Sequence, residues 1–176
     1  MMQTEVLQAM QDRRSCRAYL PEQIKPEELD AVLTAGTWAP TGMGAQSPVI
    51  VAVQDKATRD TLSRLNAAVM GNDRDPFYGA PTVLVVLADK SRHTCVEDGS
   101  LVMGNLLLAA HAAGLGACWI HRAREVFAGD EGKALLAKWG LDAEKYIGVG
   151  HCILGYAAPG GYREAAPRKA DYVVRV

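Results

Sequence analysis

The sequence lacks the features that mark secreted, membrane-spanning and nucleic-acid-binding proteins. Its 19 Lys and Arg nearly balance its 20 Asp and Glu, so the net charge is −1 and no global field attracts nucleic acid or an anionic membrane. The opening residues contain neither a cationic leader nor an apolar run, and no apolar stretch reaches the about 20 residues that cross a bilayer. We therefore expect a cytoplasmic protein with no nucleic-acid or membrane partner, in which any anion site is local.

Cysteine and the common ligand motifs are also scarce. The four cysteines are widely spaced and form no CxxC pair, which is typical of reduced thiols rather than of a disulfide scaffold or zinc site. The four histidines have no metal-ligand spacing, and the HExxH, GxGxxG and GxxxxGK[ST] motifs are absent. We expect no metal, and neither a Rossmann fingerprint nor a phosphate loop supports a nucleotide site.

Hydrophobic residues make up 49% of the chain, enough for a substantial core in one domain over residues 1–176. Apolar spacing predicts helices at 5–12, from 26 to about 36–40, at 58–70, at 98–113 and at 134–139. Continuous apolar runs predict strands at 49–53, 81–88, 117–121 and 147–156, with a last extended run at 172–174. Such runs are typical of strands covered on both faces. Strands interleaved with helices predict an α+β fold, an α/β sandwich.

The helix predicted at 98–113 is apolar on nearly all sides, yet it is too short to cross a bilayer. In so small a chain this pattern indicates burial beyond the core of one subunit, so we expect a two-fold dimer. The tail from Ala157 onward is rich in glycine and proline, and we expect it to lie along the partner.

Three arginines and a serine lie within five residues, as Arg13, Arg14, Ser15 and Arg17. Guanidinium groups and a hydroxyl suit a phosphate, because they match its oxygens with charge-assisted hydrogen bonds. The alternative is a solvated basic turn, since charge runs usually face water. Cys16 would be reactive beside these arginines if it were exposed, and a packed thiol is the alternative.

Three segments taken together resemble the nitroreductase family of FMN-dependent oxidoreductases. They are residues 13–17 (RRSCR), 39–46 (APTGMGAQ) and 114–121 (GLGACWIH). A fourth, residues 148–156 followed by Pro167-Arg168-Lys169, agrees with the closing strand and basic tail of that family. The resemblance implies a central, mostly antiparallel sheet flanked by helices, and a C-terminal extension that reaches the partner subunit.

The resemblance also implies which residues bind FMN. Contacts to the phosphate and ribityl chain would come from Arg13, Arg14, Ser15, Arg17, Arg168 and Lys169. Pro40, Thr41, Gly44 and Gln46 would lie against the flavin of the neighbouring subunit, and Asn66 would contact the ring or the ribityl chain. Trp119, Ile120, His121 and Arg122 would lie beside the ring, with a backbone N–H directed at N5. The chain departs from the family where Asn is replaced by Gly44 and Pro-Trp by Ser47-Pro48.

By resemblance, the chain is an enzyme that passes hydride from NAD(P)H through flavin N5 to nitroaromatic, quinone or similar small acceptors, by a ping-pong mechanism. FMN would lie at the interface of a homodimer. No separate catalytic side chain is expected, because the flavin carries the electrons and the protein supplies anchoring and electrostatic tuning. Two alternatives stay open: another FMN enzyme of the same fold, such as a dehalogenase, and a non-catalytic flavin-binding module. Without the motif, His121 would be an ordinary hydrogen-bonded histidine and Trp119 a core or interface anchor.

Overall fold

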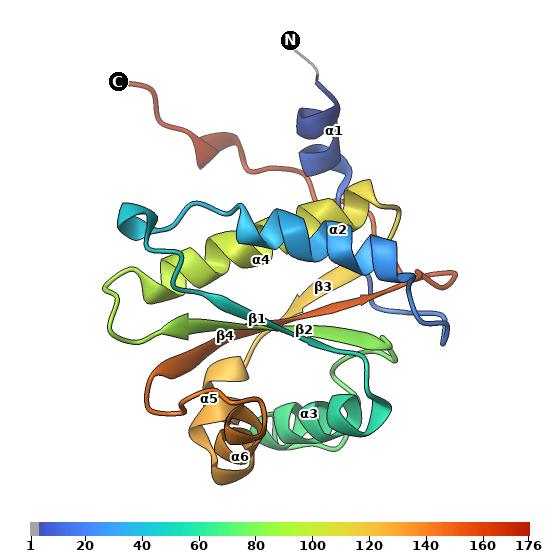
Figure 1. Cartoon of the computed structure of the whole chain (residues 1–176). Coiled ribbons are helices and arrows are strands. Elements are labelled where there is room, and N and C mark those ends of the chain that lie inside the picture. Colours follow the sequence, from blue (N-terminus) through green and yellow to red (C-terminus); the bar gives the residue numbers. More distant parts are fainter. Residues whose placement is uncertain (1–3) are drawn as a thin grey trace.

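The computed structural model describes residues 4–176 and shows a sheet between two layers of helices (Figure 1). The helices are α1 (Glu5–Asp12), α2 (Pro26–Thr37), α3 (Lys56–Val69), α4 (Cys95–Ala112), α5 (Ala123–Ala128) and α6 (Asp130–Lys138), with short turns η1 (Gly42–Gly44) and η2 (Ala170–Tyr172). The strands are β1 (Val49–Val53), β2 (Thr82–Asp89), β3 (Gly116–Ile120) and β4 (Tyr146–Gly155). Each helix and each strand of the sheet that the apolar pattern predicts is present within a few residues of its predicted bounds.

The sheet has the strand order β1-β2-β4-β3, and each neighbouring pair is antiparallel. The two central strands pair over their length, from Thr82 opposite Leu154 to Asp89 opposite Tyr146, with one register shift after Val86. Their β-branched and aliphatic residues fit a pleated surface that is covered on both sides, and residues 82–88 are all buried. The predicted α+β architecture with an antiparallel sheet is confirmed.

Helices α2 and α4 cover one face of the sheet, and α3, α5 and α6 cover the other (Figure 1). Because successive side chains of a strand point to opposite faces, β2 contributes to both cores. Leu84 and Val86 pack on the side of α2 and α4, whereas Val83 and Val85 pack on the side of α3 and α5. The sandwich therefore has two hydrophobic cores, separated by the sheet.

Helix α4 carries the apolar pattern that extends around most of its surface. Val102, Met103 and Leu106 are buried, while Leu101 is exposed on the outer side. Asp98 is a buried carboxylate in the first turn of this largely apolar helix. Within residues 4–176, no helix combines the length and the apolar character that crossing a membrane requires.

One sequence expectation about the strands was wrong, one helix was missed, and one extended run was found in part. Strand β1 is not covered on both faces: it lies at the edge of the sheet, Ala52 is exposed and residues 49–51 are only half-buried. Helix α5 was not predicted, since its six residues are too few for a periodic signal. Of the extended run predicted at 172–174, Tyr172 instead ends turn η2, whereas Val173 has an extended backbone.

The N-terminal segment and the C-terminal tail attach to the sheet side by side. The backbone N–H of Cys16 donates to the carbonyl of Ala117 (2.9 Å), and that of Arg17 donates to the carbonyl of Gly161 (2.8 Å). Helix α1 buries none of its residues, and every residue from 162 to 176 is exposed. Both chain ends therefore extend from the same side of the body, as Figure 1 shows.

Candidate cofactor site

A cavity of about 700 Å³ lies between the end of α1, the segment that follows it and the C-terminal tail. Its lining comes from both ends of the chain and includes five arginines and one carboxylate, so it is named the arginine pocket below. The lining residues are Met10, Gln11, Arg13, Arg14, Ser15, Arg17, Arg163, Glu164, Ala165, Ala166, Pro167 and Arg168.

The backbone of residues 13–17 explains why the arginines face this pocket. Arg13 ends α1, and the chain then runs extended and forms a bridge between Ser15 and Ala117 of β3. Alternate side chains of an extended segment point to opposite sides. Cys16 is therefore fully buried beneath the segment, whereas Ser15 and Arg17 line the pocket. Glycine is required below Cys16, because a Cβ at Gly116 would approach its Sγ to 2.8 Å.

The buried position of Cys16 settles the two interpretations of this thiol in favour of a packed group. Its Sγ lies 3.2 Å from the carbonyl of Ala18, and it is shielded from solvent. Cys118 and Cys152 are likewise buried, and burial raises the pKa of Cys152 to about 12. Cys152 therefore stays protonated at neutral pH, and none of these three thiols lines the arginine pocket.

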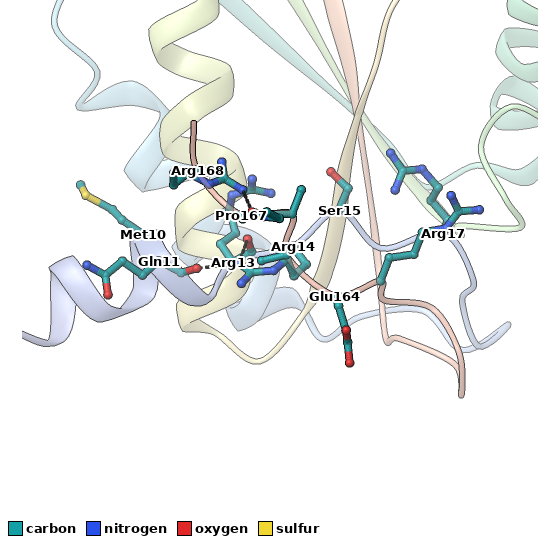
Figure 2. A pocket seen from close by; sticks show the side chains of 12 residues that line it. Met10, Gln11, Arg13, Arg14, Ser15, Arg17, Glu164, Pro167 and Arg168 are labelled. Atoms are coloured by element: carbon teal, nitrogen blue, oxygen red, sulfur yellow. Dashed lines mark hydrogen bonds between the residues drawn. The ribbon is translucent and has the colours of Figure 1, made fainter. Parts of the chain in front are cut away.

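The arginine pocket carries a surplus of unpaired positive charge. Within residues 4–176, the guanidinium groups of Arg13, Arg17 and Arg163 have no hydrogen-bond or ion-pair partner, whereas that of Arg168 donates to the carbonyl of Ala166 at 2.7 Å. In Figure 2, Arg13 and Arg168 gather on one side of Ser15, and Arg17 lies on the other. Side chains of like charge collect at one place when an anion binds between them, and guanidinium groups match phosphate oxygens in pairs. The pocket therefore has the donor set of a phosphate site.

The glycine-rich loop at 41–46 is held by a buried carboxylate. The backbone N–H of Gly42 donates to Oδ1 of Asp98 (2.8 Å), and Oγ1 of Thr94 donates to Oδ2 of the same residue (3.2 Å). A Cβ at Gly42 would overlap Thr94 Oγ1, so this close approach needs glycine. Met43 has a left-handed backbone with φ of 56°, and its side chain is 99% exposed. The loop is thus fixed at its start and presents its tip to the outside.

The end of β3 and the turn that follows it contain a second group of the residues predicted to bind FMN. Ile120 is buried and His121 is exposed, while Arg122 is half-buried and has a left-handed φ of 75°. Trp119 is half-buried, and its indole Nε1–H is shielded from solvent with no hydrogen-bond partner in the described chain. Such an orphaned donor is uncommon in folded proteins, and this one lies against Gly150 of β4.

The structure brings together some of the residues predicted to bind FMN and not others. Arg13, Arg14, Ser15, Arg17 and Arg168 all line the arginine pocket. Lys169 does not line it, and its Nζ lies 3.8 Å from a carboxylate oxygen of Asp171. The remaining predicted contacts do not line this pocket. They are Pro40, Thr41, Gly44, Gln46, Asn66, Trp119, Ile120, His121 and Arg122. Thr41 and Gln46 instead line a separate cavity of about 350 Å³ beside α2 and β1.

Three residues of these regions were missed by the sequence analysis. Arg163 lines the arginine pocket, and its basic side chain so close to Arg168 was the signal that could have found it. Asp98 could have been found as an acidic residue within an apolar helix. His151, which contacts Asn66 from within the sheet, left no sequence signal because it lies inside a predicted buried strand.

The sheet order and the two helical layers define an α+β protein, and residues from both chain ends line its arginine pocket. The model of the nitroreductase family matches residues 10–72 and 68–156, which is most of the chain. The chain belongs to the nitroreductase family.

Solved structures of this family match nearly the whole chain. A nitroreductase with bound FMN from Bacteroides fragilis NCTC 9343 is 28% identical, with a TM-score of 0.90, over 99% of this chain and 100% of that chain. An FMN-dependent nitroreductase from Clostridium difficile R20291 is 25% identical, with a TM-score of 0.84, over 98% and 99% of the two chains.

Sequence relatives match over shorter stretches. An FMN reductase (NAD(P)H) from Bacillus subtilis (strain 168) is 32% identical over 88 residues, which are 50% of this chain and 33% of that protein. A relative from Methanothermobacter thermautotrophicus is 29% identical over 120 residues, which are 65% of this chain and 60% of that protein.

Proposed function

We propose that the chain is an FMN- and NAD(P)H-dependent oxidoreductase of the nitroreductase type. The observation that carries the proposal is the arginine pocket, in which the guanidinium groups of Arg13 and Arg17 have no partner in the described chain and share the lining with Ser15. This donor set fits the phosphate of FMN, because unpaired guanidinium groups and a hydroxyl match its charge and its oxygens. The printed names of the relatives, a nitroreductase with bound FMN and an FMN reductase, support the same cofactor.

In this proposal Arg13, Arg14, Ser15, Arg17 and Arg168 would hold the phosphate. Arg14 and Arg168 already donate to backbone carbonyls, but a guanidinium has five N–H groups and keeps donors for a ligand. Asp171 competes for Lys169, which makes Lys169 the weakest member of the predicted set. When bound, FMN supplies the hydride chemistry, by a ping-pong cycle from NAD(P)H to a nitroaromatic, quinone or similar acceptor.

The segment after β3 would serve the ring end of the cofactor. Trp119 and Ile120 end β3 and pair with β4, and His121 and Arg122 form the turn that follows. A backbone N–H of this segment would donate to N5, and fixed N–H donors stabilise negative charge in a site shielded from water. Asn66 would contribute to the same region.

We further propose a homodimer with FMN at the subunit interface. The loop at 40–46 does not line the arginine pocket of its own chain, so a second copy would supply it. Trp38 is 80% exposed, and Tyr172 and Val174 of the tail are also exposed. Exposed apolar groups of this size are typical of interaction surfaces, and the tail would reach the partner. A mass in light scattering near 18.9 kDa, the mass of one chain, would contradict the shared site.

We also propose the domain organisation of the chain and its location in the cell. Residues 1–176 would act as a single nitroreductase-like domain, since β2 and β4 contribute to both cores of the sandwich. The protein would work in the cytoplasm, where thiols stay reduced, and Cys16, Cys95, Cys118 and Cys152 are all free.

The test is reconstitution of the purified protein with FMN. We expect a yellow protein that bleaches with NADH or NADPH and regains its colour with menadione or a nitrofuran. Arg17→Ala should retain less FMN, whereas Arg64→Ala should not, because Arg64 pairs with Glu131 outside the pocket. Protein that stays colourless would overturn the cofactor assignment. A yellow protein that neither NADH nor NADPH bleaches would identify a flavin-binding module without this activity.

A further inference from the structure

Asn66 is a fully buried side chain on α3 that holds two successive residues of the turn after β3. Its Nδ2–H donates to the backbone carbonyl of His121 (2.7 Å), and its Oδ1 accepts from Nε of Arg122 (3.0 Å). The guanidinium can only donate, so the amide oxygen must face Arg122 and the amide nitrogen must face His121. Both the oxygen and the nitrogen of the Asn66 amide therefore have a hydrogen-bond partner within the protein.

The turn that Asn66 holds is strained. Arg122 has a φ of 75°, a conformation that side chains other than glycine rarely adopt, and it forms the N-cap of α5 without a capping side-chain hydrogen bond. Strained residues persist where the surrounding structure fixes them, and they cluster at functional sites. Asn66 supplies such a restraint, because it binds the carbonyl before Arg122 and the side chain of Arg122 together.

His151 supports Asn66 from inside the sheet. Its Nδ1 lies 3.4 Å from Nδ2 of Asn66, and its ring packs between Phe77 and Phe127, with ring centroids 5.3 and 6.0 Å away. Burial lowers the pKa of His151 to about 3, so the ring is neutral at physiological pH. A hydrogen bond from Nδ2 of Asn66 to Nδ1 of His151 requires a neutral ring without a proton on Nδ1, whereas a charged ring would present a second donor there. In that tautomer the Nε2–H is buried and has no hydrogen-bond partner in the described chain.

We propose that Asn66, backed by His151, is a positioning residue that fixes the backbone of His121 and Arg122. The proposal rests on the proposed function, in which this turn lies beside the flavin ring. In this proposal Asn66 binds the turn at His121 and Arg122 and does not contact the cofactor itself. Its consequence is that Asn66 controls the affinity and the reduction potential of the flavin through the backbone N–H groups of the turn.

The experiment compares Asn66→Leu with Asn105→Leu in the full chain. Asn105 is a matched control, because it also donates from Nδ2 to a backbone carbonyl, that of Ala35 at 2.9 Å, but on the opposite face of the sheet. The first measurement is hydrogen exchange of residues 117–128 in the FMN-free protein. Asn66→Leu should raise the exchange rate of the amides after His121 by roughly tenfold, the effect of losing one buried hydrogen bond. Asn105→Leu should leave these amides unchanged.

A second pair of variants tests the strain directly. Arg122→Gly and Arg122→Ala both lose the side-chain bond to Asn66, but only Arg122→Gly removes the cost of the left-handed backbone. Exchange after His121 should therefore be faster in Arg122→Ala than in Arg122→Gly. Asn66→Asp covers the case in which Asn66→Leu does not fold, because it keeps the acceptor for Arg122 and places a carboxylate against the carbonyl of His121.

The second measurement is the midpoint potential and the dissociation constant of FMN in the loaded protein. Both should shift in Asn66→Leu and stay at the wild-type values in Asn105→Leu. Equal exchange, potential and affinity in Asn66→Leu and the wild type would overturn the positioning role. If the wild type binds no FMN, the proposed function fails, while the exchange of the FMN-free protein still decides whether Asn66 holds the turn.

Discussion

The buried ring of His151 predicts how the stability of the protein depends on pH. Burial lowers the pKa of His151 in the folded protein to about 3, from an ordinary value of 6.5. Between these two values the unfolded chain binds one proton more than the folded chain, so the free energy of unfolding falls as the pH falls. The slope for one such group is about 1.4 kcal/mol per pH unit. From pH 6.5 to pH 5, the loss from His151 alone is therefore roughly 2 kcal/mol.

His151→Gln removes this proton-binding group and keeps a polar side chain of similar length. The variant should be less stable than the wild type at pH 7, because it loses the ring contacts with Phe77 and Phe127. Its stability should nevertheless fall less between pH 6.5 and pH 5, by about the same 2 kcal/mol. Urea unfolding of the FMN-free protein at four pH values measures both effects. Carboxylates with a lowered pKa, such as Asp75, titrate mainly below this range. Parallel pH dependence in the two proteins would refute the reasoning.

Three further predictions concern the candidate site. Arg17→Ala and Arg168→Ala should each weaken FMN binding roughly tenfold, since each removes a charge-assisted hydrogen bond from a partly solvated pocket, with little change in melting temperature; unchanged FMN affinity in both would contradict the phosphate assignment. Lys169→Ala should weaken binding less than Arg168→Ala in the same titration, because Lys169 faces Asp171 rather than the pocket; a larger effect for Lys169→Ala would reverse that order. Gly42→Ala should displace the glycine-rich loop and lower turnover, and Thr94→Ala in the same chain should restore it by removing the overlapping oxygen; a double variant no better than Gly42→Ala would count against steric conflict as the cause.

Local patterns were enough to predict the elements of the fold. The run Val83–Leu87 predicted a buried strand because β-branched and aliphatic residues in sequence fit a strand covered on both faces, and residues 82–88 of β2 are buried. The same kind of run at Val49–Val53 led to a wrong expectation for β1. The strand order places β1 at the edge of the sheet. That order depends on pairing between distant segments, which the composition of one segment does not predict. Helix α5 escaped prediction because six residues hold fewer than two turns.

The candidate site was predictable as far as it depends on neighbouring residues. Arg13 and Arg17 were identified from the basic cluster together with the resemblance to the family, and both line one pocket. That the tail meets them there depends on a backbone hydrogen bond from Arg17 to Gly161, across most of the chain, which no local pattern shows. Asn66 was expected as a contact of the flavin, yet its amide is bound to the turn at His121. Burial of that kind follows from packing between α3 and β4, and not from residue type.

The central claim is that the arginines near both ends of the chain bind the phosphate of FMN. The most direct measurement compares the affinities of the purified protein for FMN and for riboflavin, which lacks the phosphate, in a fluorescence titration at two salt concentrations. The account predicts that FMN binds at least about a hundredfold more tightly, as two or more charge-assisted hydrogen bonds would provide, and that added salt reduces the difference. Equal affinities for the two flavins would contradict it.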